Sequence, residues 1–265
     1  DFEVKEKIKK HIADSVLNVK DSLKAHRDSV KEATPRILET FAFPDSLQYK
    51  RIIQWTHERE FHKMDVKQPD TSYNHWLHDY PFYRKDVNAT WLGVAGSALQ
   101  YYNWFNRTSE NGVSFYNPYE SWTYSTKTLP MYNTKTPYTE LAYFGTIFAN
   151  AQKESDNLHI LTTQNIFPEL NFTLEYDRFG GNGIMQGEKT TNKTFVTSVN
   201  YLGKRYMMHT GYIHNKVIRK ENGGTSDNSM VRDTTLDARE YPINLNNAST
   251  NLIRNTFFLD QQYRI

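Results

Sequence analysis

Two carboxylates, Glu175 and Asp177, are the side chains best placed for acid–base chemistry, because they stand two positions apart in a strand-like stretch. Residues i and i+2 of a strand point to the same face, so the two groups would share one side of a sheet. Paired carboxylates can work as a general acid and a general base. They can also line the polar interior of a pore. We assign them to a lumen and expect no catalytic residues, so the chain is predicted not to be an enzyme.

The histidines show no metal-ligand pattern. His57 and His62 resemble a zinc-protease pair, but they stand five apart instead of four, which on a helix separates them by about 140°. His75, His78 and Asp79 could meet one ion, but the sequence offers no further ligand beside them. We therefore predict no metal and no cofactor.

Composition excludes several other functions. The chain has 265 residues, no cysteine and a formal net charge of +2, so it has no disulfide framework and no long-range attraction to nucleic acid. We expect no nucleic-acid partner. The 18 tyrosines suit a protein with two membrane–water interfaces, where amphipathic rings prefer to lie. A tyrosine-rich soluble β-sandwich has the same composition.

Six stretches after Pro137 alternate apolar and polar residues, which is the period of a β-strand. We place them near residues 138–150, 157–167, 170–179, 193–202, 205–218 and 251–265. Each is long enough to cross a bilayer at a tilt. The connections alternate long and short, with tight turns at 167–170 and 202–205. This pattern is typical of a transmembrane barrel with its short turns in the periplasm, although a soluble sandwich alternates in the same way.

The alternation assigns faces to individual residues. We predict that the lumen-facing side chains are Asn171, Thr173, Glu175, Asp177, Ser198, Asn200, Arg254 and Asp260. The predicted lipid-facing side chains are Leu170, Phe172, Leu174, Tyr176, Phe195, Val199, Tyr201, Phe257 and Leu259. Phe144 and Phe258 interrupt the polar face, and we expect either one to pack against an inserted segment.

Two other regions precede these strands. Residues 1–35 are predicted to form a charged amphipathic helix, because apolar residues recur at spacings of three, four and seven up to Pro35. Residues 36–137 contain all five tryptophans and are predicted to be an irregular β segment, plug-like or periplasmic. Within it, the small residues between Trp91 and Gln100 suggest a turn between two short strands. Residues 138–265 would then be the barrel part.

Four strings in order resemble the "putative porin" family of Bacteroidetes outer membranes, over roughly residues 41–265. They are residues 44–55 (PDSLQYKRIIQW), 91–100 (WLGVAGSALQ), 136–143 (TPYTELAY) and 159–165 (HILTTQN). The resemblance implies an outer-membrane β-barrel with a periplasmic N-terminal extension and no known catalytic residues. The aspartate–serine triplets of the helix also resemble an acceptor pattern for periplasmic O-glycosylation.

Together these observations predict a mainly β chain, an antiparallel up-and-down transmembrane β-barrel preceded by a long N-terminal helix. Six strands are fewer than the roughly eight that a membrane barrel needs, so we expect them to be the first part of a larger, incomplete barrel. The expected function is passive passage of small solutes. The alternatives are a non-conducting subunit of an outer-membrane complex and a secreted glycan-binding β-sandwich. The expected partners are outer-membrane lipid and a periplasmic or outer-membrane protein that contacts the helix, itself in the periplasm.

Overall fold

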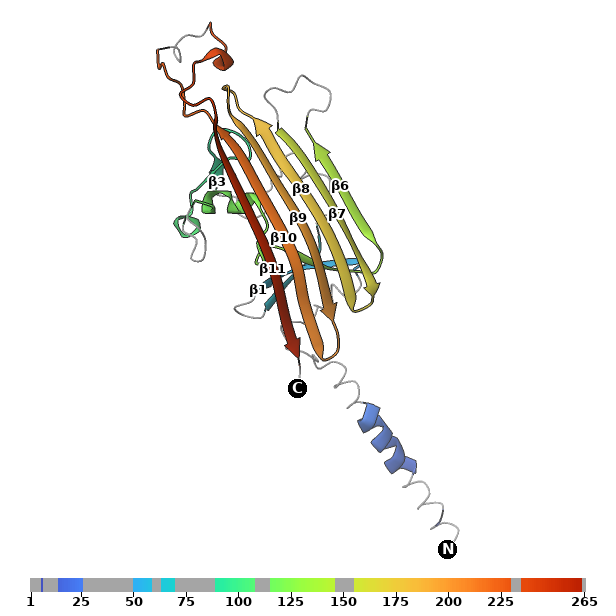
Figure 1. Cartoon of the computed structure of the whole chain (residues 1–265). Coiled ribbons are helices and arrows are strands. Elements are labelled where there is room, and N and C mark those ends of the chain that lie inside the picture. Colours follow the sequence, from blue (N-terminus) through green and yellow to red (C-terminus); the bar gives the residue numbers. More distant parts are fainter. Residues whose placement is uncertain are drawn as a thin grey trace.

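The computed structural model of the chain is mainly β, with antiparallel sheets and one N-terminal helix (Figure 1). It describes residues 6, 14–25, 50–58, 63–69, 89–107, 115–145, 155–229 and 235–263. The largest element is a six-stranded sheet in which every strand pairs with its neighbour in sequence. Its strands are β6 (Tyr138–Phe144), β7 (Ser155–Phe167), β8 (Leu170–Asn182), β9 (Lys189–Leu202), β10 (Tyr206–Glu221) and β11 (Ala248–Tyr263).

All six predicted strands are confirmed, and so is the alternation of their connections. Tight turns join β7 to β8 and β9 to β10, whereas 222–247 is a long loop that contains the 3-10 helix η6 (Ala238–Glu240). Five of the strands extend two to four residues beyond the predicted bounds at the loop end, for example to Asn182 in β8 and from Lys189 in β9. β6 instead ends at Phe144, and residues 146–150 of its predicted range lie outside the described residues. The strand pattern therefore continues into stretches rich in Gly, Asn and Thr that the sequence suggested were loops.

The two faces of the six-stranded sheet have opposite polarity. Along β9, the buried positions include Thr194, Ser198 and Asn200, while Phe195 and Val199 point the other way. We call the face with these buried polar residues the inner face, and the opposite one the outer face. A soluble sheet normally buries its apolar face, so the polarity of this sheet is inverted.

The inner face is covered by the described residues between 51 and 135, which we call the covering segment. It contains a three-stranded sheet of β1 (Ile52–Glu58), β2 (Lys63–Lys67) and β5 (Pro130–Thr134), and a hairpin of β3 (Ala89–Trp91) and β4 (Leu99–Tyr101). Two 3-10 helices complete it, η3 (Trp104–Asn106) and η4 (Asn117–Trp122). The predicted turn between two short strands is confirmed by the β3–β4 hairpin. In Figure 1 these elements lie behind the six-stranded sheet.

Two clusters of buried side chains join the covering segment to the inner face. One brings Trp55 and Met131 together with Val196, Ile213 and Phe258. Phe258, which interrupts the polar alternation of β11, is therefore explained by packing against an inserted segment, and its ring lies over Gly211. A Cβ at Gly211 would come within 2.9 Å of that ring, so glycine makes room for it. The other aromatic interruption, the side chain of Phe144, lies outside the described residues.

The second cluster lies nearer the loop end. Trp122 of η4 stacks on Phe179 of β8, with ring centroids 4.8 Å apart, beside Val217 and Tyr101. The apolar core of this chain is thus shared between two layers, and neither layer buries it alone.

Residues 14–25 form a helix whose side chains are all exposed, and the remainder of the predicted helix, apart from residue 6, lies outside the described residues. Figure 1 shows the helix projecting from the end of the molecule where the tight turns and the C-terminal end of β11 lie. No helix among the described residues is both long and apolar enough to cross a membrane.

The six-stranded sheet is open, with β6 and β11 at its edges, so the barrel is not closed in this structure. The covering segment packs against the inner face of this open sheet.

Candidate functional site

The most concentrated polar group on the inner face is a histidine among three carboxylates. Glu140 comes from β6, His159 from β7, and Glu175 and Asp177 from β8. We call these four residues the acid–histidine cluster. The register of β7 with β8 places His159 directly opposite Asp177, and strand alternation puts Glu175 on the same face. Three neighbouring strands thus bring the four side chains together.

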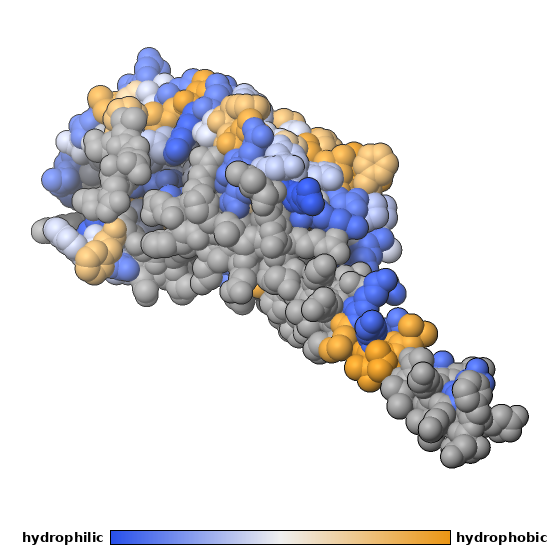
Figure 2. All heavy atoms as spheres, turned by 90° about the horizontal axis from the view of Figure 1, so that it is seen from below, coloured by the Kyte–Doolittle hydropathy of each residue, from blue (hydrophilic) through white to orange (hydrophobic). Residues whose placement is uncertain are grey.

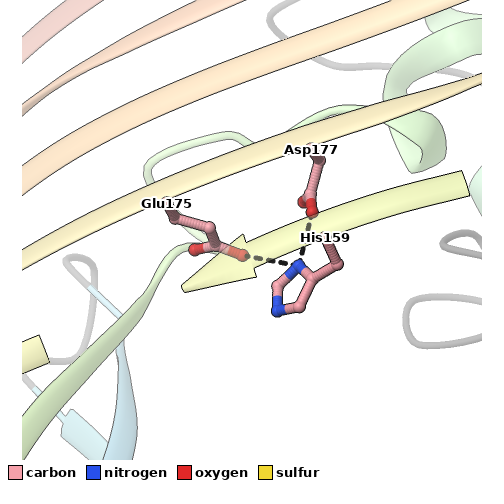
Figure 3. A group of neighbouring side chains, drawn as sticks. All are labelled: His159, Glu175 and Asp177. Carbon is pink, nitrogen blue, oxygen red and sulfur yellow. Dashed lines mark hydrogen bonds and ion pairs between the residues drawn. The ribbon is translucent and has the colours of Figure 1, made fainter. Parts of the chain in front are cut away.

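Figure 3 shows the Nδ1 atom of His159 turned toward both carboxylates of β8. Nδ1 lies 2.5 Å from Asp177 Oδ1 and 3.9 Å from Glu175 Oε1. On the other side of the ring, Nε2 lies 4.0 Å from Glu140 Oε1, and the Tyr138 hydroxyl donates a hydrogen bond to Glu140 Oε2. The short separation indicates that Nδ1–H donates to Asp177, which fixes the ring orientation.

The burial of these side chains strengthens the electrostatic interactions of their charges. The side chains of Glu175 and His159 are 2% and 8% exposed, and those of Asp177 and Glu140 are 21% exposed. Coulomb interactions are stronger in such partly desolvated surroundings than in bulk water. Three carboxylates outnumber one imidazole, so the cluster is negative when the carboxylates are ionised.

The donor set could suit a metal ion, but the geometry is that of a hydrogen-bonded group. His159, Glu175 and Asp177 offer one nitrogen and two oxygens within 4.8 Å of one another, the one such group among the described residues. Two ligands of a tetrahedral zinc ion lie about 3.3 Å apart, given metal–ligand bonds of about 2 Å. The 2.5 Å separation of Nδ1 and Oδ1 is shorter than that, so in this structure the two atoms form a hydrogen bond. The candidate ligands His62, His75, His78 and Asp79 lie outside the described residues, as does the side chain of His57.

A cavity of about 650 Å³ lies between the acid–histidine cluster and the covering segment. All four cluster residues line it on the sheet side, and Trp55, Tyr132, Lys67 and Lys127 are among the residues that line it on the other side. A space of this volume accommodates a small hydrated solute. The arrangement can bind or conduct such a solute and gives it a lining of both charges, with carboxylates concentrated on the sheet.

Other inner-face residues hold the covering segment by its backbone. Asn215 of β10 donates to the Tyr124 carbonyl at 2.8 Å and accepts from the Tyr124 N–H at 3.3 Å, as a neighbouring strand would. Asn200 donates to the Tyr132 carbonyl at 2.9 Å. Because the amide side chain supplies both a donor and an acceptor, asparagine can pair with an irregular backbone.

A second set of such bonds lies at the β3–β4 turn. Thr190 donates to the Ala95 carbonyl and Asn192 to the Gly96 carbonyl, at 2.5 and 3.0 Å. Gly96 has φ +89°, and a Cβ there would lie 3.0 Å from Thr190 Oγ1 and 3.1 Å from Asn192 Nδ2. Glycine is therefore needed for this turn to approach the sheet.

The structure places all eight predicted lumen-facing residues on the inner face. Five are buried, and three are half-buried, namely Asp177, Arg254 and Asp260. They do not share one site. Glu175 and Asp177 join the acid–histidine cluster, Asn171 and Thr173 bond to each other and to Thr163, and the Arg254 guanidinium lies 5.4 Å from the centre of the Tyr116 ring.

The nine predicted lipid-facing residues lie on the outer face. Phe257 and Leu259 of β11 are 74% and 49% exposed, and the others are half-buried by their neighbours in the sheet. In Figure 2 apolar side chains, mixed with polar ones, follow the upper edge of the molecule, which is the outer side of the sheet. No described element covers this face.

Sequence reasoning missed His159, Glu140, Asn215 and His209. His159 was noted only within the string 159–165 and was not predicted to face the lumen, although the alternation of its strand puts it on the inner face. His209 accepts a hydrogen bond from the Trp55 indole at 3.1 Å, a contact between residues 154 positions apart that no local pattern could indicate.

The comparisons agree with this architecture. The family described as "Putative porin" matches residues 51–265, which includes the covering segment and all six strands. No curated protein and no solved structure matches the chain. The match gives the chain a porin-like function in the coarse sense and suggests an outer-membrane location. By this match over most of its length, the chain belongs to the putative porin family.

Proposed function

We propose that the chain forms the six-stranded part of an outer-membrane β-barrel that lets small solutes pass without an energy source. The observation that carries the proposal is the inverted polarity of the six-stranded sheet. Its inner face buries Asn171, Glu175 and His209, while Phe172 and Phe257 lie on the outer face. Hydrocarbon stabilises such an outer face, and a polar interior suits water and solutes. A secreted sandwich would need the reverse arrangement.

The covering segment then acts as a plug that narrows the lumen, and the cavity of about 650 Å³ is the passage or part of it. The acid–histidine cluster gives this passage a negative wall, which favours cations and neutral solutes over anions. In this proposal the cluster lines a lumen and has no catalytic role. The loop end faces outward, and the tight turns and the helix lie in the periplasm.

The test is liposome swelling with the purified full chain in zwitterionic vesicles. Uptake of small neutral sugars at a rate that falls with sugar size supports a passive conduit. A control variant with charged residues on the outer face separates loss of insertion from loss of passage. Sedimentation with outer membranes after carbonate washing tests the location.

A second function is favoured by two observations. The covering segment is tied to the inner face by Asn200, Asn215 and Trp55, and the helix of residues 14–25 exposes Val16, Leu17, Val19 and Leu23. A fixed plug and a helix with exposed apolar side chains suit a non-conducting subunit that holds a periplasmic partner. Swelling that stays at the level of empty vesicles, although the protein is inserted, supports this function over the first.

A further inference from the structure

A row of positive charge crosses the outer face near the loop end. Arg178 of β8 pairs in register with Lys193 of β9, and Lys193 pairs in register with Lys216 of β10. Neighbouring strands lie about 4.8 Å apart, so the three side chains start within about 10 Å. We call these three residues the basic row. All three occupy outward-pointing positions, and Arg178 and Lys193 are exposed.

The basic row is poorly neutralised by the protein itself. Like charges directly opposite one another on neighbouring strands are destabilising, and Lys193 has such a neighbour on both sides. The Arg178 guanidinium lies 3.9 Å from Asp156 Oδ2, at the limit of an ion pair. Within the part of the chain that the structure describes, Lys193 and Lys216 form no ion pair. An external anion would relieve this repulsion.

A second pair of lysines extends the positive charge. Lys189 and Lys220 also pair in register on the outer face, closer to the loops, and both are exposed. They line a hollow of about 290 Å³ together with Arg239 and one carboxylate, Glu188. The positive potential therefore spreads over two levels of the outer face.

The position of the basic row along the strands, relative to the bilayer, indicates which ligand it would meet. The row of residues next to it contains Tyr176, Phe195 and His214, and beyond that lie Leu174, Thr197 and Tyr212. Tyrosine rings such as that of Tyr176 prefer the level of lipid headgroups, and the apolar band lies below them. From Tyr206 to His214 the strand rises by about 27 Å, close to the roughly 25 Å of a barrel's apolar band before tilt is considered. The basic row thus stands where headgroup phosphates lie.

We propose that the basic row binds the phosphate-bearing headgroup of an anionic lipid in the leaflet at the loop end. The inference rests on the proposed membrane-spanning function. Lysine and arginine are the usual phosphate partners, and three of them in one row can contact one phosphate together. The lipid would hold the barrel at a defined depth, with its acyl chains along the apolar band.

The experiment measures lipid retention by the full chain in nanodiscs of phosphatidylcholine that contain a minor fraction of phosphatidic acid. Lipids that remain bound are counted by native mass spectrometry after release into detergent. The variant K193Q/K216Q should retain about 25-fold less phosphatidic acid than the parent. Each charge removed near an anionic surface reduces binding by about fivefold, and two charges are removed. The matched control, K204Q/R205Q, removes two charges at the tight turn between β9 and β10 and should retain lipid like the parent.

Three outcomes would overturn the inference. The first is equal retention of phosphatidic acid by the parent and K193Q/K216Q. This result would mean that the basic row does not bind lipid and would favour an acidic protein as its partner. The second is an equal loss in both variants, which would show a general charge effect. The third is displacement of the lipid by millimolar inorganic phosphate, which would indicate a site for free phosphate. Failure of the proposed function is seen separately, as a parent chain that does not insert into pure phosphatidylcholine.

Discussion

The indole Nε1–H of Trp55 donates a hydrogen bond to Nε2 of His209 across the interface between the covering segment and the inner face, at 3.1 Å. Both side chains are almost fully buried, and their rings meet edge to face with centroids 6.1 Å apart. This one contact connects the first strand of the covering segment to β10 near its tight-turn end. The Trp55–His209 hydrogen bond therefore indicates whether the covering segment is packed against the inner face.

Trp55→Phe should loosen the covering segment. The substitution keeps an aromatic ring but removes the indole donor, which leaves His209 Nε2 without it and costs about 1–3 kcal/mol. We expect a lower unfolding midpoint in detergent and faster swelling of proteoliposomes. Trp104 is 69% exposed, so Trp104→Phe is the control and should change neither quantity. A Trp55→Phe protein as stable as the parent would contradict the role of this bond.

Asn215→Ala should weaken the same interface at a second point. Asn215 bonds to both backbone groups of Tyr124 and accepts from the Thr194 hydroxyl at 3.0 Å. Loss of these bonds should reduce the free energy of unfolding by about 2–3 kcal/mol and expose residues near Tyr124 to protease. Asn255 also makes side-chain bonds, but on the exposed outer face. Asn255→Ala should cost less than 1 kcal/mol.

The variant E175Q/D177N should change ion preference. It removes two negative charges from the wall of the cavity while keeping the side-chain shapes. We expect the cation-over-anion permeability ratio, obtained from reversal potentials in a salt gradient, to fall about two- to fivefold. The control E169Q/D237N removes two charges from an exposed turn and an exposed loop and should leave the ratio unchanged. An unchanged ratio in E175Q/D177N would mean that ions do not pass this wall.

Phe172→Arg should impair insertion into the bilayer. Phe172 lies in the apolar part of the outer face, where an arginine near the bilayer midplane costs about 2–4 kcal/mol. Thr191 also points outward, but beyond the basic row, where the same change costs about 0–1 kcal/mol. The comparison of F172R with T191R by protease protection in vesicles measures this depth dependence. Equal insertion would argue that the outer face does not meet hydrocarbon.

Tyr116→Phe should change the response to alkali. Burial raises the pKa of the Tyr116 hydroxyl, although its hydrogen bond to Thr123 and the nearby Arg254 oppose the shift. A raised pKa in the folded state means that stability is complete below the unfolded value, near 10, and is lost as pH rises through the folded value. The phenylalanine variant should be less stable at pH 8, because it lacks the bond to Thr123, and should lose less further stability at pH 11. Parallel losses in parent and variant would refute the assignment.

Local pattern was enough to predict the strands, their turns and the polarity of each face, because alternation and turn chemistry are properties of neighbouring residues. The acid–histidine cluster required more. A regular hairpin closed by Phe167 and Leu170 would place Ile160 opposite Asp177. The irregularity between Asn165 and Phe167 shifts the register by one, so that His159 takes this place. A single extra residue in a strand leaves little trace in sequence.

The short strands and buried side chains of the covering segment could not be predicted from local sequence pattern either. Its strands are short, and Trp55 is buried against a partner 154 residues away. Phe144 and Phe258 were the residues whose mismatch with their strands indicated an inserted segment, and the structure shows the Phe258 ring in the shared core.

The order of the strands has a consequence for biogenesis. Each strand of the six-stranded sheet pairs with its immediate predecessor, so the sheet can grow hairpin by hairpin at low entropic cost. The covering segment is synthesised before the strands that it contacts, the last of which is β11. We therefore expect Trp55 and Met131 to remain solvent-exposed until the six-stranded sheet has formed, and a chaperone to bind the covering segment during this time.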